Sequence, residues 1–211
     1  MPDDGADRFS HDESALVAGL QQHDARAFEA LFDLHADRVY RIAAGMLGND
    51  ADAQEVVQAT FLSVFEAIDG FEPRARLSTW LYRIAFNHAL MLLRRRHPTE
   101  ELPDDDGALT VPTALMDWSA LPENQLLSAE AQEALRAAIL SLPAGLRAAF
   151  VLRDIEGLST SDCAHVQSIS ETACKVRLHR ARLALREQLS VYFSEWIAAP
   201  ARQRVADKGD L

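Results

Sequence analysis

Apolar residues recur at helical spacing near the start of the chain, between residues 12 and 47. They return every three or four positions and no proline interrupts them, so the pattern predicts two helices. The apolar positions are Leu16, Leu20, Phe28, Leu31, Phe32, Val39, Ile42 and Leu47.

Two more helices are expected after a short break that contains glycine. Asp50 or Asp52 is placed to cap the third helix. Ser78 or Thr79 opens the fourth, which runs into three arginines and stops before a proline. The expected inward positions of these two helices are Val57, Phe61, Val64, Phe65, Ile68, Leu81, Ile84, Ala85 and Leu92. Residues 14–96 are therefore predicted to form a four-helix domain.

The composition changes in the middle of the chain. Residues 97–128 hold four prolines and little periodicity, which predicts an extended linker. Residues 97–130 carry eight acidic side chains and no lysine or arginine. The apolar residues of this linker are unusual for an inert spacer and suggest that it docks on something. They are Leu109, Val111, Leu115, Met116, Trp118 and Leu121.

The helical pattern resumes at about residue 123, breaks at Pro143 and then continues, so residues 129–190 are predicted to form a second domain. An acidic tail at residues 1–13 and an extension at residues 191–211 flank the two domains. The predicted fold class is all-α, with two small helical domains joined by an extended acidic linker.

Two short helical segments lie near the end of the second domain, at residues 160–167 and 170–189, and a tight turn joins them. This arrangement is typical of a helix-turn-helix, although an ordinary helical hairpin has a similar periodicity. Ser159 and Ser170 are placed to cap the two helices. The second helix is expected to turn three residues to the core: Cys174, Leu178 and Leu185.

Charge gives conflicting signals until it is divided by segment. The 211 residues carry a net charge of −11, which at face value argues against a polyanionic partner. Residues 1–15 and 97–130 account for −12, so the rest of the two predicted domains is close to neutral. Basic residues are bunched in two windows without an acid, 73–96 and 172–186. One such run is often only a solvated face, but two at the ends of helical blocks favour a nucleic-acid partner.

The first basic stretch is interleaved with aromatic residues. Arginines hold a phosphate backbone while exposed aromatic faces stack on unpaired bases, a combination suited to single strands. Aromatic residues at helical spacing are more often part of a core, so at least one of Trp80, Tyr82 and Phe86 is expected to be buried. Phe71 and Leu77 bracket a polar excursion and could shape a loop pocket.

Several motifs together resemble the sigma-70 family of bacterial RNA polymerase sigma factors, in its extracytoplasmic-function (ECF) subgroup. Residues 52–61, DAQEVVQATF, are similar to the family's helix that binds the clamp helices of the largest polymerase subunit. Residues 71–96, with LSTWLYRIA at 77–85, resemble the region that melts the promoter and reads the −10 element. GLS at 157–159 and KVRLHRAR at 175–182 are similar to the helix-turn-helix that reads the −35 element.

This resemblance implies three sets of site residues. The polymerase-binding set is Asp52, Glu55, Val57, Gln58 and Phe61. The −10 DNA-binding set is Phe71, Arg74, Arg76, Trp80, Arg83, Asn87, Arg94 and Arg95. The −35 DNA-binding set is Ser170, Glu171, Thr172, Lys175, Arg177 and Arg180. In the −10 set, the loop at 71–77 and Asn87 would capture a base flipped out of the non-template strand, because an amide both donates and accepts hydrogen bonds. Trp80 would stand near the separating strands.

The resemblance also implies partners: core RNA polymerase, through its clamp helices and its flap, promoter DNA, and an anti-sigma factor. It gives the acidic linker a role, since a polyanionic strand can occupy the cationic RNA channel of the polymerase. No cofactor is expected. The longest apolar runs are too short to span a bilayer and the acidic start is unlike a secretory signal, so a cytoplasmic location without membrane insertion is predicted.

Other chemistries are weaker. Cys163, His165, Cys174 and His179 lie within 17 residues, but residues 163 and 165 point about 200° apart on a helix. Both cysteines stand where the family usually has aliphatic core residues, which disfavours zinc and a disulfide switch alike. No phosphate loop or nucleophile motif indicates an enzyme. The main rival is a two-domain helix-turn-helix transcriptional regulator that acts without core polymerase.

Overall fold

The computed structural model describes three stretches of the chain: residues 13–72, 76–96 and 129–206, with side chains as far as residue 190. The predicted linker, most of the predicted tail and Arg74 lie outside the described residues. The described stretches are helical and contain no strand, which confirms the all-α prediction. None of the helices in these stretches is long and apolar enough to cross a membrane.

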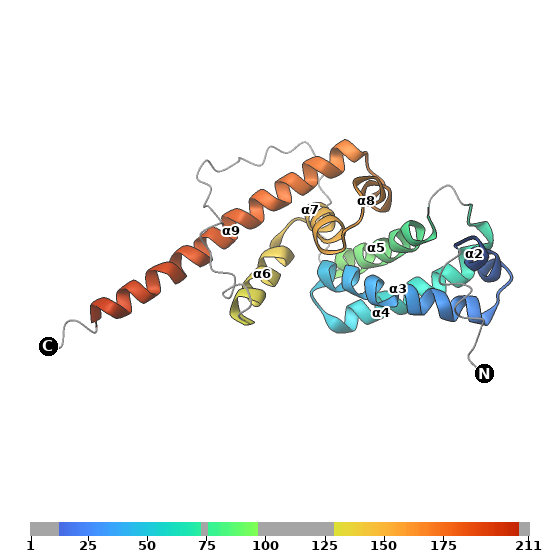
Figure 1. Cartoon of the computed structure of the whole chain (residues 1–211), viewed down its shortest axis with the longest axis horizontal. Helices are drawn as coiled ribbons and strands as arrows, with labels where there is room; N and C mark the ends of the chain where they lie inside the picture. Colours follow the sequence, from blue (N-terminus) through green and yellow to red (C-terminus); the bar gives the residue numbers. More distant parts are fainter. Residues whose placement is uncertain (1–12, 73–75, 97–128, 207–211) are drawn as a thin grey trace.

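Four helices form the first domain, as predicted (Figure 1). They are α2 (Glu13–Gln21), α3 (Ala25–Leu47), α4 (Asp50–Ala67) and α5 (Leu77–Arg96), with a 3-10 turn, η1 (Ile68–Gly70), after α4. Helices α3, α4 and α5 pack against one another in all three pairs, and α2 packs on α3.

The start of α4 differs from the prediction. Asn49 is its N-cap, not Asp50 or Asp52: the Asn49 side chain accepts a hydrogen bond from the Asp52 N–H at 3.1 Å. Asn49 can do this because its backbone is extended (φ −135°, ψ 127°), as an N-cap requires. Gly48 supplies the preceding turn in the left-handed region (φ 66°), which ends α3.

The start of α5 also differs, because the helix begins at Leu77, ahead of Ser78 and Thr79. The Leu77 N–H donates to the Glu13 carboxylate on α2 at 2.7 Å. A free N–H at a helix start is thus satisfied by an acid from another helix. Thr79 is buried and its hydroxyl is used elsewhere, in a contact with the second domain.

The buried face of α4 is turned from the predicted one. Phe65 was expected to point inward but is 48% exposed, and Phe32 on α3 is 47% exposed. Val64 and Ile68 are buried as predicted. The rest of the buried stripe is formed by Ala53, Val56 and Thr60, several of which are small, and this brings α4 close to α3 and α5. The larger stripe therefore forms the rim of the domain, where Phe65 packs against Phe28 with ring centroids 5.1 Å apart.

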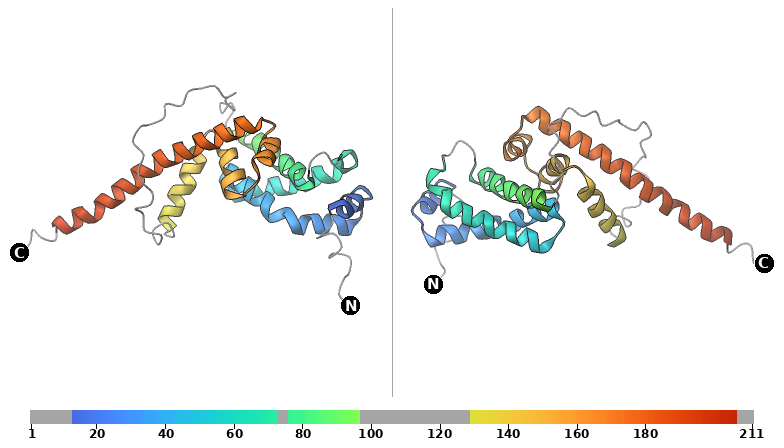
Figure 2. Two further views of the ribbon diagram at one scale, coloured as in Figure 1. Left: turned by 45° about the horizontal axis from the view of Figure 1, so that its top comes forward. Right: turned by 180° about the vertical axis from the view of Figure 1, so that it is seen from behind.

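The second domain contains α6 (Ala129–Ser141), α7 (Ala144–Phe150), a π-helical segment, η4 (Val151–Ile155), α8 (Thr160–Gln167) and α9 (Glu171–Ala206). Helix α9 has 36 residues, so the start of the predicted C-terminal extension continues the same helix. Figures 1 and 2 show that its far end projects away from both domains.

The two domains share one apolar core. Ala148 on α7, Leu152 in η4 and Ala164 on α8 are buried in the same cluster as the inward residues of α3 and α5. Figure 2 shows α7 and α8 lying against the first domain in both views. Gly45 on α3 permits the close approach, since a Cβ there would lie 3.0 Å from the methyl carbons of Val151. A second, smaller core joins α6, α7 and α9.

Candidate nucleic-acid and polymerase interface

Helix α5 presents one polar face that matches the predicted −10 set. Arg83, Asn87, Arg94 and Arg95 are exposed. The spacing of four and seven residues brings Arg83, Asn87 and Arg94 to one side of the helix, in line with the half-buried Trp80 one turn before Arg83. Arg95 points about 100° away from Arg94. Two guanidinium groups and one amide on a single face, with a third guanidinium group beside it, can hold a phosphate backbone and read a base edge.

The aromatic residues of this region divide between core and surface. Tyr82 and Phe86 are buried, which confirms that some of the aromatic residues of this stretch belong to the core. Phe71 is also buried and packs against the Trp80 ring, with centroids 5.1 Å apart and planes at 52°. Trp80 is therefore the half-exposed member of a tilted aromatic pair, and the buried Phe71 supports it from the core side. Arg76 is exposed at the end of the loop.

The helix-turn-helix forms as predicted from α8 and α9. The Ser159 hydroxyl accepts from the Asp162 N–H at 3.0 Å, and the Ser170 hydroxyl accepts from the Ala173 N–H at 3.1 Å. Both serines therefore cap their helices. The turn itself relies on Ser168 in the left-handed region (φ 57°), a conformation that favours glycine.

The start of α9 carries the predicted −35 set. Ser170, Glu171, Thr172 and Lys175 are exposed, and Arg180 is half-buried. Arg177 is half-buried too, and its Nη1 donates to Gln167 Oε1 on α8 at 3.2 Å. The predicted core residues on the opposite face, Cys174, Leu178 and Leu185, are all buried. The N-terminal end of α9 therefore exposes polar side chains, while its apolar residues pack into the core.

The predicted polymerase-binding residues of α4 occupy different environments. Glu55 and Gln58 are exposed, whereas Val57 and Phe61 are half-buried. Asp52 is buried and forms an ion pair with Arg96 at the end of α5. The exposed apolar residues beside Glu55 and Gln58 were not predicted as site residues. They are Phe32, Leu62 and Phe65.

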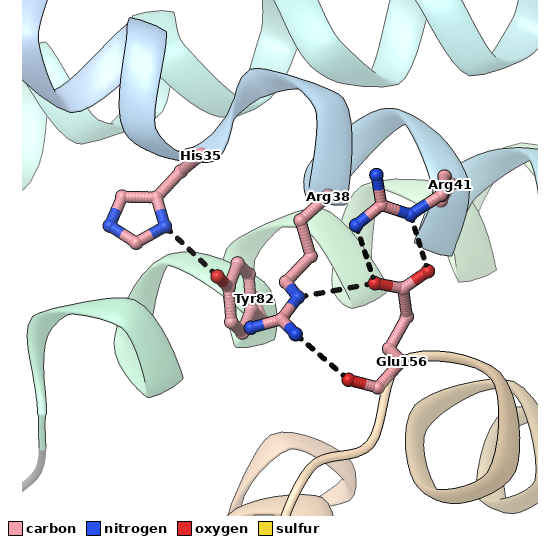
Figure 3. Close-up of polar contacts among 5 residues, drawn as sticks. All are labelled: His35, Arg38, Arg41, Tyr82 and Glu156. Carbon is pink, nitrogen blue, oxygen red and sulfur yellow. Dashed lines mark hydrogen bonds and ion pairs between the residues drawn. The ribbon is translucent and has the colours of Figure 1, made fainter.

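A buried carboxylate holds the two domains together (Figure 3). The Glu156 side chain, 1% exposed, follows η4 and lies between two arginines of α3. Arg41 donates from Nε to Oε1 at 2.8 Å and from Nη2 to Oε2 at 3.0 Å. Arg38 donates from Nε to Oε2 at 3.1 Å and from Nη2 to the Glu156 carbonyl at 2.9 Å. Three hydrogen bonds to the carboxylate therefore compensate for the burial of its charge, and the fourth is accepted by the backbone carbonyl.

Aromatic and histidine side chains complete this cluster on the α5 side. The Arg38 guanidinium lies 5.7 Å from the centre of the Tyr82 ring. The Tyr82 hydroxyl is 2.9 Å from His35 Nδ1, as Figure 3 shows. Burial lowers the pKa of His35, with Arg38 adding to the effect, so the ring stays neutral at pH 7. Burial likewise raises the pKa of Tyr82, which keeps its proton.

Two further contacts join the domains. Thr79 Oγ1 on α5 donates to Asp162 Oδ1 on α8 at 2.8 Å, and the Ser159 hydroxyl donates to Asp162 Oδ2 at 2.5 Å. These hydrogen bonds, that of Ser159 first, lower the pKa of Asp162. Arg147 on α7 is buried and donates to the Met46 carbonyl at 2.7 Å. It thereby places a cation at the negative end of α3.

None of these interdomain residues was predicted from the sequence. Glu156 lies 118 residues from Arg38 and 115 residues from Arg41 along the chain. In the sequence, each of the three resembles an ordinary charged surface residue. In the described stretches, no group of three or more His, Cys, Asp or Glu side chains could hold a metal ion. Cys163 is buried whereas His165 is exposed, so those two side chains point apart.

Comparison with known families agrees with this architecture. Sigma-70 region 2 matches residues 31–99, and sigma-70 region 4 matches residues 132–185. The first match covers most of α3 and all of α4 and α5, and the second covers most of α6 through the helix-turn-helix. The chain belongs to the sigma-70 family of RNA polymerase sigma factors.

Relatives place it more narrowly, in the ECF subgroup. The ECF RNA polymerase sigma factor SigW of Bacillus subtilis is 33% identical over 177 residues, which cover 82% of this chain and 94% of the relative. The ECF sigma-E factor of Escherichia coli K12 is 30% identical over 176 residues, covering 82% and 92%. These relatives are sigma factors, which are transcription factors and not enzymes.

Solved structures share the arrangement of both domains. CnrH, solved in complex with the cytosolic domain of CnrY, superposes with a TM-score of 0.63 at 25% identity, covering 85% of this chain and 97% of that one. RpoE of Bartonella quintana, solved with the anti-sigma factor NepR, gives 0.58 at 23% identity, covering 79% and 99%. The latter likeness supports the fold.

The Glu156 cluster predicts a specific loss of stability. Replacing Glu156→Gln removes the charge but keeps the shape, so two arginines lose their partner. We expect the free energy of unfolding in urea to fall by about 1–3 kcal/mol. The matched control is Asp154→Asn, which breaks the more exposed pair with Arg182 and should cost less than about 1 kcal/mol. Equal losses in both variants would contradict the role given to Glu156.

Proposed function

We propose that this chain binds core RNA polymerase and directs initiation at specific promoters by reading a −35 duplex and a −10 single strand. The observation that carries the proposal is the pair of polar, basic helix faces on α5 and α9. Each lies on a helix within one of the two matched sigma-70 regions. A helix-turn-helix regulator without polymerase would account for the α9 face alone.

The −35 element is assigned to the start of α9. In a helix-turn-helix the second helix enters the major groove, with its N-terminal residues toward the base edges. Here Glu171, Thr172 and Lys175 are exposed at that end, and the positive N-terminal end of the helix at Ser170 favours a phosphate. Arg177 and Arg180 lie further along and would contact the backbone.

The −10 element is assigned to α5 and the loop before it. Arg76, Arg83, Arg94 and Arg95 supply positive charge, and Arg74, outside the described residues, is assigned to the same set. Phe71 acts from beneath, because it supports the Trp80 ring on which a base or the edge of the melted duplex would stack.

Core polymerase binding is assigned to the outer side of α4. Glu55 and Gln58 provide polar contacts, and the rim of Phe61, Phe65 and Leu62 provides apolar area. Val57 lies half-buried behind this rim. Asp52 contributes through its ion pair with Arg96, which fixes α4 to α5. The polymerase flap is the proposed partner of the second domain, and the linker is the proposed occupant of the RNA channel.

An anti-sigma factor is a further proposed partner. Two proteins with this fold were solved bound to a partner: CnrH to the cytosolic domain of CnrY, and the sigma factor RpoE to the anti-sigma factor NepR. A cytoplasmic location follows from the proposed partners.

Promoter binding requires the two domains to separate. The −35 and −10 elements lie about 25 base pairs apart, which is about 85 Å of B-form DNA. In the structure, Thr79 on the −10 helix and Asp162 in the helix-turn-helix are 2.8 Å apart. The structure is therefore interpreted as a closed form, in which Glu156 and Asp162 hold the two DNA-reading domains together.

Reconstitution tests the proposal as a whole. Mixed with purified core RNA polymerase, the full chain is expected to co-elute as a stable complex and to start transcripts at discrete sites in a randomised promoter library. A chain that binds duplex DNA alone but fails to bind core polymerase would favour the rival regulator.

Lys175 gives a prediction about salt. Lys175→Gln removes an exposed cation from the reading end of α9. We expect weaker promoter binding by the holoenzyme and a log–log dependence on salt that is shallower by roughly one unit. Arg26→Gln is the control, since it removes an exposed cation from α3 that is not among the proposed DNA contacts. Identical salt slopes for both variants would rule out the Lys175 contact.

Asn87 gives a prediction about sequence preference. Asn87→Ala removes the amide that is proposed to read a −10 base, so the preferred base at one position should change. Arg83→Ala, one turn earlier on the same face, should instead weaken binding to all sequences alike. Selection from a −10 library with each holoenzyme measures both effects. An unchanged preference with Asn87→Ala would refute the assignment.

A further inference from the structure

Two thiols meet inside the helix-turn-helix. Cys163 on α8 and Cys174 on α9 are the only cysteines in the sequence, and both are fully buried. Their Sγ atoms lie 3.0 Å apart, although eleven residues and the Ser168 turn separate them along the chain. A disulfide bond needs an Sγ separation of about 2.05 Å. The helix crossing therefore brings the sulfurs to within about 1 Å of bonding distance, which their spacing in the sequence did not indicate.

Polar groups surround this pair in a region that is otherwise apolar. Gln167 Nε2 donates to Cys163 Sγ at 3.2 Å, and Gln167 Oε1 accepts from Arg177 at 3.2 Å. A chain of hydrogen bonds thus runs from the thiols to an arginine of the proposed −35 face. Two aliphatic side chains would pack here without any of these contacts.

The two thiols are not equivalent. The hydrogen bond between the two thiols lowers the pKa of Cys174, and the positive charges of Arg153 and Arg177 add to this effect. The same contact raises the pKa of Cys163, which keeps its proton. Cys174 is therefore the thiol that ionises and attacks, and Cys163 is the one that resolves.

We propose that Cys163 and Cys174 are an oxidation site at which hydrogen peroxide forms a reversible disulfide between α8 and α9. The Cys174 thiolate attacks one peroxide oxygen, the O–O bond breaks, and the departing hydroxide takes up a proton to leave as water. Cys163 sulfur then attacks the resulting sulfenic acid, the S–O bond breaks, and the hydroxyl leaves with the Cys163 proton as a second water. Two thiols are oxidised and one peroxide is reduced, and a dithiol reverses the bond.

The bond would change the −35 reading end of α9, an effect that rests on the proposed function. Cys174 directly precedes Lys175 on α9; the Cys174 side chain is buried and that of Lys175 is exposed. Closing the sulfur gap by about 1 Å shifts this turn against α8 and removes Cys163 as a thiol partner of Gln167. Because contacts to base edges are sensitive to such shifts, we expect oxidation to weaken −35 recognition.

Mass spectrometry of the free chain tests the chemistry without polymerase. After peroxide, the thiol count in denaturant should fall from two to zero, and the monomer should lose the mass of two hydrogens. A protease that cleaves after glutamate should release residues 157–171 joined to residues 172–187, and dithiothreitol should separate them. Cys163→Ser and Cys174→Ser should each block the link. Two intact thiols, or only sulfinic acid or cross-linked dimers, would overturn the site.

Transcription tests the consequence. The chain is oxidised alone, freed of peroxide and assembled with untreated core polymerase. Initiation from a promoter that depends on its −35 element should fall several-fold and recover with dithiothreitol, while the double variant C163S/C174S should not respond. A disulfide that leaves initiation unchanged would overturn the regulatory effect. Because the reduced chain is assayed alongside, failure of the proposed function itself would show as inactivity in both samples.

Discussion

The closed arrangement depends on one buried carboxylate. Glu156 is almost free of solvent contact, and such a charge is costly unless it is paired and hydrogen-bonded. Arg38 and Arg41 satisfy it only when α3 and the segment after η4 lie together. The apolar contacts of α7 and α8 with the first domain add buried surface area, but such contacts do not depend strongly on the orientation of the two domains. The ion cluster is what fixes how the two domains face each other.

This constraint connects folding with function. The residues that face one another across the interface, such as Thr79 and Asp162, belong to the helices assigned to promoter reading or to their immediate neighbours. The exposed faces of α5 and α9 are formed before any DNA is present, because caps, ion pairs and core residues already fix their helices. In the closed form these two faces lie closer together than the two promoter elements do on DNA. Opening would therefore increase the distance between the faces and leave the recognition surfaces themselves unchanged.

Local chemistry explains which features could be predicted. The helices, the tight turn and the capping roles of Ser159 and Ser170 follow from periodicity and from side chains that act within three residues. The orientation of α4 did not follow, because two neighbouring apolar stripes compete and only the packing of α3 and α5 decides between them. Glu156 carried no signal, since its partners are more than a hundred residues away. The roles assigned to individual DNA- and polymerase-contacting residues stay predictions.

The shared core has a consequence for how long an opened chain survives. Residues such as Ala148 and Leu152 are buried in one apolar cluster with the inward residues of α3 and α5. Separation exposes this apolar surface, and exposed apolar surface invites aggregation and proteolysis. A chain that opens without a partner would then be removed quickly, whereas one bound to a large partner would be protected. The amount of open protein in a cell would be limited by the supply of binding sites for it, with no separate sensor required.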